Sequence, residues 1–165
     1  MRLQAAALAM SAMFFAACGG GDTAAEDTPS TTPAAGTEAA AGTAAGTGTM
    51  APITGQTHEV QMVGDADGYR YEPAELTIAA GDGVRFVMVS GPPHNVSFEP
   101  NGIPAGSAEQ LSANMSDKLS ELSSNMYMNV GDEVTVSFAN VPTGEYNFIC
   151  TPHLAMGMRG KITVQ

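Results

Sequence analysis

The sequence has few of the residues on which several classes of protein depend. Among 165 residues there is no Trp, and there are only two Cys, three His and six Lys or Arg. Two cysteines are too few for a disulfide framework. Three histidines cannot supply both a multinuclear metal centre and a catalytic histidine network. The 17 acidic residues leave a formal net charge of −11, so nucleic acid and anionic lipid head groups are excluded as main partners.

The first 18 residues have the layout of an export signal. Arg2 precedes an apolar run that ends at Ala17 and Cys18. This run is shorter than the ~20 apolar residues of a transmembrane helix and is typical of a secretory signal. Phe15-Ala16-Ala17-Cys18 also resembles the lipobox of bacterial lipoproteins, although Phe15 stands where an aliphatic residue is usual. We expect residues 1–18 to be a signal peptide with Cys18 lipidated, and the mature chain to be extracytoplasmic, in the periplasm or cell envelope. The alternative is an ordinary signal peptide that is cleaved nearby and leaves a free thiol.

Residues 19–54 differ sharply in composition from the rest of the chain. Of these 36 residues, 26 are Ala, Gly or Thr, and none is Lys, Arg or aromatic. Such a segment cannot bury enough apolar surface to offset the entropy lost on ordering. We therefore expect a disordered linker over 19–54, followed by one small domain at 55–165.

The domain has the sequence pattern of an all-β fold. Short runs rich in β-branched and aromatic residues are separated by Gly, Pro, Asn and Asp, which is typical of strands joined by turns. The predicted strands are 58–63, 71–78, 84–89, 94–98, 133–138, 144–150 and 160–164. Ala108, Leu111 and Met115 have helical spacing and predict one short helix within a long excursion at 100–129. Seven short strands with frequent turns indicate an antiparallel β-sandwich.

The last quarter of the chain carries the candidate chemistry. Strand alternation places Tyr146, Phe148 and Cys150 on one face, which must be the buried face because it carries two aromatic rings. The loop that follows brings His153 and the thioethers of Met156 and Met158 close to the Cys150 thiol.

A second histidine, His94, lies on a proline-stiffened turn far upstream. One thiolate, two imidazoles and a weak thioether are the ligands of a blue-copper electron-transfer site. Taken singly, a buried Cys is usually inert and a lone His is usually structural. Zinc would bind the same atoms, but structural zinc sites seldom recruit Met.

The domain resembles the plastocyanin-like family of small type I copper proteins, the cupredoxins. The matching pieces are Tyr71-Glu72-Pro73, Gly81-Asp82, Pro93-His94-Asn95-Val96, Cys150-Thr151-Pro152-His153, and Gly157-Met158 with Gly160 to Val164. The resemblance implies a Greek-key sandwich with one copper ion bound by His94, Cys150, His153 and an axial Met. Met158 is favoured because its surroundings match the longer ligand loop of plastocyanin and pseudoazurin, and Met156 is the alternative. Asn95 is the expected outer-shell residue that joins the ligand loops, beside Pro93.

Several features depart from the family pattern or add to it. The excursion at 100–129 is longer than plastocyanin needs and is expected to cover a sheet edge or to shape a partner surface. Ile149 replaces an aromatic residue next to the Cys, so a remote electron exit there is not expected. The exposed edge of His153 is instead the expected electron port, and its predicted surroundings are Pro92, Leu154, Ala155 and Met156.

Two further groups of residues have weaker interpretations. An acidic group suggests a docking patch for a basic redox partner such as a c-type cytochrome, although such runs are more often solvated faces. Its members are Asp65, Asp67, Glu72 and Glu75. Met115, Met126 and Met128 could form a second soft-metal site, but alternating methionines more often fill a core.

The sequence thus favours a membrane-tethered, single-electron carrier that acts between redox partners and has no small-molecule substrate. The alternative is a copper-binding protein that buffers or delivers the metal in the envelope, or a structural lipoprotein whose loop fits a metal by chance. A multicopper enzyme needs paired His-x-His ligands, and only His58, which is expected at the surface, is left over. We therefore do not expect an enzyme.

Overall fold

The computed structural model describes residues 49–165. The predicted signal peptide, the predicted lipidation of Cys18 and most of the predicted linker lie outside the described residues. Among residues 49–165, none of the helices has the length and apolarity that a membrane span requires.

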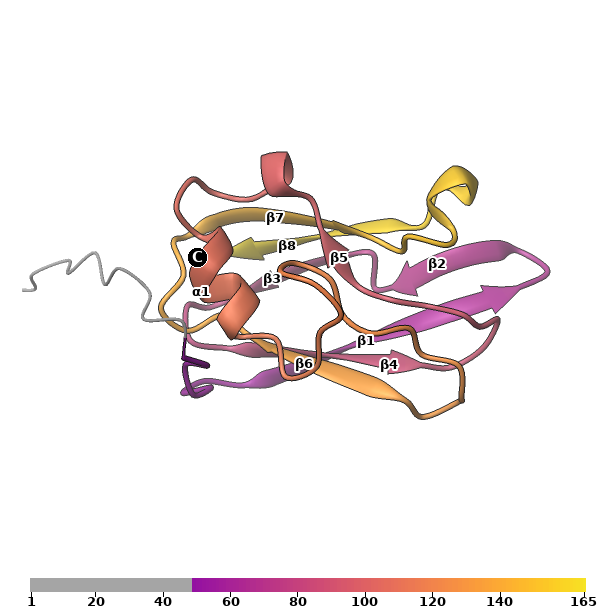
Figure 1. Ribbon diagram of the computed structural model, residues 1–165, viewed down its shortest axis with the longest axis horizontal. Helices are drawn as coiled ribbons and strands as arrows, with labels where there is room; N and C mark the ends of the chain where they lie inside the picture. The colour runs from indigo at the N-terminus through magenta and orange to yellow at the C-terminus, as the bar shows by residue number, and fades with distance from the viewer. Residues whose placement is uncertain (1–48) are drawn as a thin grey trace, which may run out of the picture. The chain divides into compact units, whose positions relative to one another are not determined.

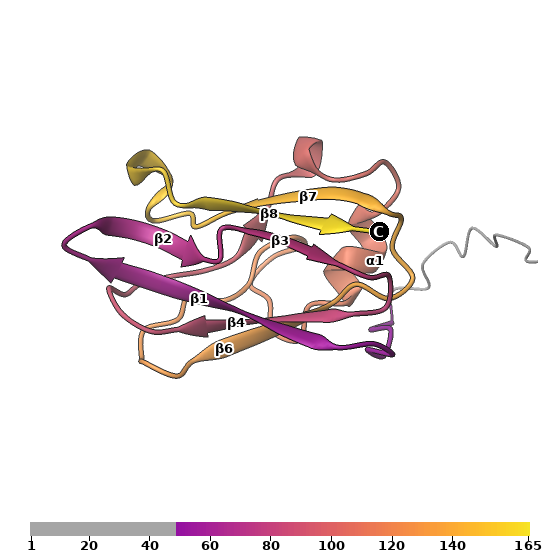
Figure 2. The same ribbon diagram turned by 180° about the vertical axis from the view of Figure 1, so that it is seen from behind.

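Two four-stranded sheets form the two layers of the domain (Figures 1 and 2). The first sheet has the order β2-β1-β4-β6, and its strands are β1 (Thr57–Asp65), β2 (Gly68–Glu72), β4 (Gly83–Met88) and β6 (Glu133–Ser137). The second has the order β3-β8-β7-β5, and its strands are β3 (Glu75–Ile78), β8 (Arg159–Val164), β7 (Gly144–Ile149) and β5 (Ser97–Phe98). The expected all-β sandwich is confirmed.

Each sheet includes one parallel pair among its antiparallel neighbours. Strand β4 lies parallel to β1, and β8 lies parallel to β3. The chain passes to the second sheet at β3 before it returns as β4, so β4 reaches β1 by a crossover rather than by a hairpin. Short-range alternation predicts strands but not which strands become neighbours, and this is why the sequence pattern did not show the parallel pairs.

The core between the sheets is aromatic, as the strand alternation predicted. Tyr146, Phe148 and Cys150 are all buried. The Phe148 ring meets the rings of Tyr71 and Phe86 edge to face, with centroids 4.7 and 5.2 Å apart. This packing fixes the end of β7, and therefore the position at which Cys150 leaves the sheet.

The excursion contains the 3-10 helix η1 (Pro100–Gly102) and the expected short helix, α1 (Ala108–Ala113). Its last part runs back along the segment that leads into β5. Backbone hydrogen bonds join His94 to Tyr127 in both directions, Ser124 to Val96, and Phe98 to Leu122. The excursion therefore covers the free edge of this segment, which is one of its two expected roles.

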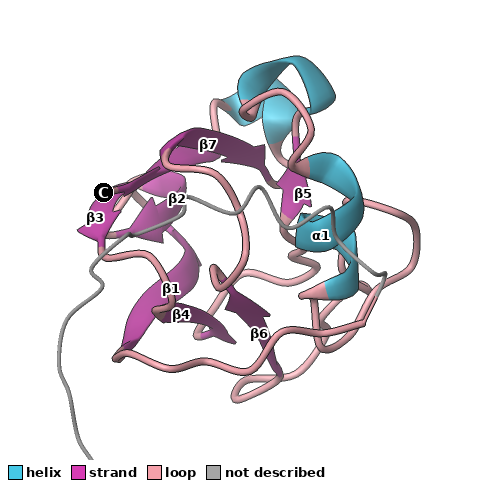
Figure 3. Cartoon of the chain, turned by 90° about the vertical axis from the view of Figure 1, so that its left-hand side faces the viewer, coloured by secondary structure: helices cyan, strands magenta, loops and turns pink. Residues whose placement is uncertain are grey.

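Residues 49–55 are packed against the domain, although the sequence placed the linker boundary after residue 54. Ala51 is buried and its N–H donates to Oδ1 of Asn114 at 2.9 Å. The N–H groups of Thr54 and Gly55 donate to the carbonyl of Gly81. The described chain thus enters beside α1, at the end where the C-terminus also lies (Figure 3).

Replacement of Asn114 by Ala should lower the free energy of unfolding by about 2–4 kcal/mol, because it leaves buried groups without partners. The Asn114 side chain accepts from Ala51 and Gln110 and donates to the carbonyls of Ser137 and Ala139, each at 2.7–2.9 Å. Urea unfolding would measure the change. Asn101→Ala, at an exposed position, is the matched control. Equal stabilities of the two variants would contradict this role of Asn114.

Candidate metal centre

His94, Cys150 and His153 bring three metal-binding atoms together. Sγ of Cys150 lies 3.6 Å from Nδ1 of His94 and 3.5 Å from Nδ1 of His153. The exposed fractions of His94, Cys150 and His153 are 0, 0 and 5%. Bond lengths of about 2.3 Å to sulfur and 2.0 Å to nitrogen, at near-tetrahedral angles, would separate the two donors by about 3.5 Å. The observed separations therefore fit a single metal ion bound by all three residues.

The loop after β7 closes on itself and places its donors by backbone hydrogen bonds. The N–H of Cys150 donates to the carbonyl of Met158, and the N–H of Met158 donates to the carbonyl of His153. The 3-10 helix η2 (Leu154–Met156) follows His153 and ends at Gly157, which has a φ of 84°. That left-handed conformation favours glycine and turns the chain back toward Cys150.

The two candidate thioethers have very different surroundings. Met158 is completely buried, whereas 57% of Met156 is exposed. Met158 is also in backbone contact with Cys150. Met158 is thus enclosed in the fold with its backbone bonded to Cys150, whereas Met156 lies on the loop surface.

The ring orientation of His94 is fixed by a hydrogen bond outside the donor set. Its Nε2 lies 2.8 Å from the carbonyl oxygen of Ser90 and donates to it. The proton is then on Nε2, and the lone pair of Nδ1 faces Cys150. The backbone of His94 is paired with Tyr127, whose hydroxyl donates to Asp117. Ser90 and Tyr127 were not singled out from the sequence.

Asn95 joins the two loops that carry the donors. Its Oδ1 accepts from the N–H of Thr151 at 2.7 Å, and its Nδ2 donates to the hydroxyls of Thr151 and Ser123. Its carbonyl accepts from the buried Tyr71 hydroxyl at 2.6 Å. Every polar group of this side chain therefore connects the His94 loop to another part of the site. Pro93, on the same turn, is half-buried.

An aromatic ring lies on His153, which the sequence analysis did not anticipate. The Tyr69 ring is stacked on the His153 imidazole, with centroids 3.6 Å apart and planes inclined by 16°. The expectation of an exposed His153 edge is therefore wrong, since only 5% of this residue is exposed. Pro92, Leu154, Ala155 and Met156 are exposed as expected.

Burial sets the protonation of the donors in the metal-free pocket. Loss of solvation lowers the pKa of His94 and of His153, and the latter is also lowered by the neighbouring His94. Burial raises the pKa of the Cys150 thiol. At neutral pH the imidazoles are neutral and ready to bind, whereas the thiol must release a proton when a metal binds.

Sequence comparison identifies the class of this site. The family described as copper binding proteins, plastocyanin/azurin family, matches residues 58–165. The chain belongs to that family. Its cofactor is copper, and the buried thiol and two imidazoles are donors that suit this metal.

Individual plastocyanins are clearly similar to the chain. Plastocyanin of Nostoc punctiforme is 38% identical over 111 residues, which cover 67% of this chain and 75% of the relative. Plastocyanin of Prochlorothrix hollandica is 39% identical over 117 residues, which cover 71% and 79%. The structure of oxidised plastocyanin from the fern Dryopteris crassirhizoma is 30% identical, with a TM-score of 0.51, and the match covers 65% of this chain and 99% of the fern protein.

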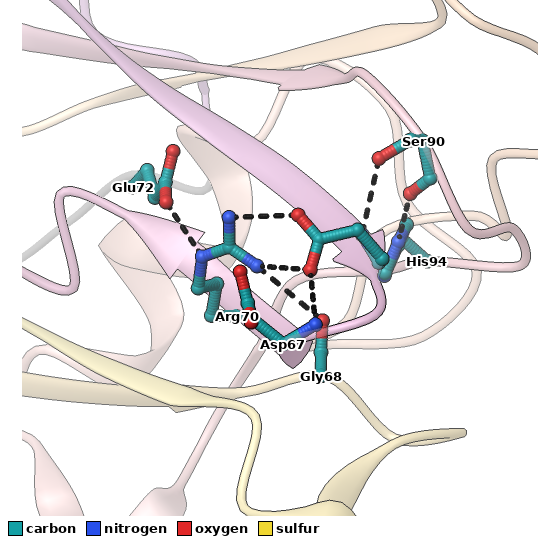
Figure 4. Close-up of polar contacts among 8 residues, drawn as sticks. Asp67, Gly68, Arg70, Glu72, Ser90 and His94 are labelled. Carbon is teal, nitrogen blue, oxygen red and sulfur yellow. Dashed lines mark hydrogen bonds and ion pairs between the residues drawn. The ribbon is translucent and has the colours of Figure 1, made fainter.

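The remaining sequence candidates contribute none of the three donor atoms. Asp65 and Glu72 both form ion pairs with Arg70, so part of the predicted acidic patch is neutralised (Figure 4). Met115 is buried in the core, whereas Met126 and Met128 are exposed.

Ile149 and His58 were also singled out from the sequence. Ile149 is half-buried. The side chain of His58 is 27% exposed, and its Nε2 lies 2.8 Å from Asp82.

Metal-free protein should lose stability as the pH falls from about 7 to about 5, because His94 and His153 have lowered pKa values in the fold. Unfolded imidazoles titrate near pH 6.5, so below this pH the unfolded chain binds more protons and is favoured. The neutral histidines therefore contribute their full stabilisation above about pH 7, and this contribution is lost as the pH falls toward about 5.

Urea unfolding across this pH range would measure the loss. A double variant, His94→Gln with His153→Gln, should show a smaller pH dependence, and an unchanged dependence would contradict the assignment. The pKa of Asp82 is lowered by its bond to His58, so the stabilisation from this carboxylate is lost only at lower pH.

Proposed function

We propose that the protein is a type I copper electron carrier in which His94, Cys150, His153 and Met158 bind one copper ion. The observation that supports this most directly is the buried Cys150 sulfur with an imidazole nitrogen at 3.5 and at 3.6 Å. Bound copper would supply one-electron chemistry by alternating between Cu(II) and Cu(I). Proteins of this family carry electrons and turn over no substrate, and we infer the same for this chain.

The side chains around the donors suit electron transfer because they keep the donors in place. Ser90 orients the His94 ring, and Asn95 joins its loop to the Cys150 loop. A donor set that is oriented before metal binding rearranges little when the charge on the metal changes. The complete burial of Cys150 also favours a carrier over a protein that delivers copper, since delivery needs an accessible site.

The carrier would act outside the cytoplasm while tethered to a membrane. The apolar leader and the lipobox-like Phe15 to Cys18 support export and lipidation. The Ala/Gly/Thr-rich stretch that follows has the composition of a flexible linker. The partners of the carrier would be redox proteins of the cell envelope, such as a c-type cytochrome.

Addition of Cu(II) to the purified chain should produce an intense absorption band from thiolate-to-copper charge transfer. Mild reduction should remove the band and oxidation should restore it. Cys150→Ser and His94→Ala should both abolish the band, because each removes a proposed ligand. Cys18→Ser is the matched control, since it removes the other cysteine and should leave the band intact. A protein that stays colourless with copper would refute the proposal.

The two methionines provide a test of the fourth ligand within the same experiment. Met158→Leu should change the band position and the reduction potential, since it removes the axial thioether. Met156→Leu makes the same chemical change on the loop surface and should leave both unchanged. The reverse result would assign the axial position to Met156.

Cys18→Ser should also release the protein from the membrane fraction into the soluble extract, because a lipid chain supplies most of the membrane affinity of an anchored protein. Fractionation of cells that express the two forms would measure this. Labelling with a radioactive fatty acid should mark the native chain and not the variant. A native chain that is fully soluble and unlabelled would refute the lipid anchor.

A further inference from the structure

Both proposed histidine ligands contact the same two-stranded hairpin, formed by β1 and β2. His153 does so through the stacked ring of Tyr69, which is part of β2. His94 does so through Ser90, whose carbonyl accepts from Nε2 of His94 and also from the N–H of Gly64 in β1, at 2.8 and 2.9 Å. In Figure 4, dashed lines join Ser90 both to His94 and to this hairpin.

These two contacts meet at one position of the hairpin. Gly64 and Tyr69 are directly paired across β1 and β2. A Cβ atom on residue 64 would lie 2.6 Å from the Tyr69 ring and 2.9 Å from Cα of Gly91, so a side chain there would displace one of them. The glycine allows the ring to lie over His153 and allows the Ser90 turn to approach the strand.

The hairpin also connects this position to the solvent. Tyr69 is only half-buried, and the neighbouring tip has exposed acidic groups. Asp65 and Glu72 contact Arg70, while Asp67 lies at the turn. The three carboxylates and one guanidinium leave a net negative charge along β2 and the turn, which complements a positively charged partner.

We propose that electrons enter and leave through the β1–β2 hairpin, and that the partner docks on it with a positively charged rim around its redox group. This inference rests on the proposed copper-carrier function. The stacked Tyr69 ring and the Ser90–Gly64 hydrogen bond provide short paths from the two imidazoles to the hairpin. In the reaction, one electron would pass from the Fe(II) haem of a partner, which would become Fe(III), to Cu(II) held by His94, Cys150 and His153, which would become Cu(I). No bond is formed or broken, and no proton is transferred.

Two substitutions of Tyr69 test the path. Stopped-flow mixing of the oxidised copper-loaded chain with a reduced, lysine-rich c-type cytochrome would give the rate of electron transfer. Tyr69→Phe keeps the stacked ring and should keep the rate, whereas Tyr69→Leu should slow transfer several-fold. In metal-free protein, Tyr69→Leu should also broaden the NMR signals of the His153 ring, and Tyr69→Phe should not. Equal rates for the two variants would overturn the path through Tyr69.

Two charge reversals test the docking surface without altering the ligands. Asp67→Lys lies at the hairpin tip, and Glu109→Lys makes the same change in net charge on α1, at the other end of the sandwich (Figure 1). At low ionic strength, Asp67→Lys should slow the reaction by about fivefold, and this effect should fade in high salt. Glu109→Lys should slow it much less. Equal effects would show that only net charge matters and would overturn the docking surface.

The absorption band separates this inference from the proposed function. If the native chain forms no band with copper, the proposed function fails and no transfer rate exists to compare. If the band is present in all variants and the rates are insensitive to Tyr69 and Asp67, the copper site stands and the hairpin inference fails. Urea unfolding of each variant would identify a loss of rate that comes from misfolding.

Discussion

The hydrogen bonds of the Asn95 amide are the interactions on which the proposed metal centre depends. His94 and Cys150 are 56 residues apart in the chain, and Asn95 joins their loops through two hydrogen bonds to Thr151. A third bond, to Ser123, ties Asn95 to the excursion. Because Asn95 is completely buried, loss of one of these bonds would leave a polar group of its side chain without a partner. The distance between the two donors is therefore set by the protein rather than by the metal.

The domain has two functionally different ends. The described chain starts beside α1 and finishes at β8, and both termini lie at the end opposite the donor loops (Figure 1). Ala51 and Thr54 are hydrogen-bonded to the domain at that end. An anchor upstream of Thr49 would therefore pull on the end that carries no donor. The β1–β2 hairpin and the loop after Cys150 would lie at the opposite end from the anchor.

The sequence predicted those parts of the site that follow from local rules. Alternation along one strand placed Cys150 on the buried face, where it lies. The preference for Met158 came instead from the resemblance to a longer ligand loop, and its role as a ligand stays a prediction. Tyr69 could not be predicted in the same way, because its stack on His153 depends on how β1 and β2 pair and on how a distant loop folds beneath them. The support from Tyr127 is similar, since it comes from the excursion whose pairing with His94 has no local signal.

Burial of the donors and access for electrons are opposing requirements, and Tyr69 reconciles them. A solvent-exposed imidazole would transfer electrons readily but would also admit water to the metal and increase the solvent rearrangement that accompanies each transfer. The Tyr69 ring is stacked on His153 at 3.6 Å and His153 is only 5% exposed, yet Tyr69 itself is only half-buried. Because the ring is an extended π-system in direct contact with the imidazole, it excludes water while it keeps the path to the surface short. Gly64 matters as well as the tyrosine, since a side chain there would displace the ring or the neighbouring Gly91 backbone.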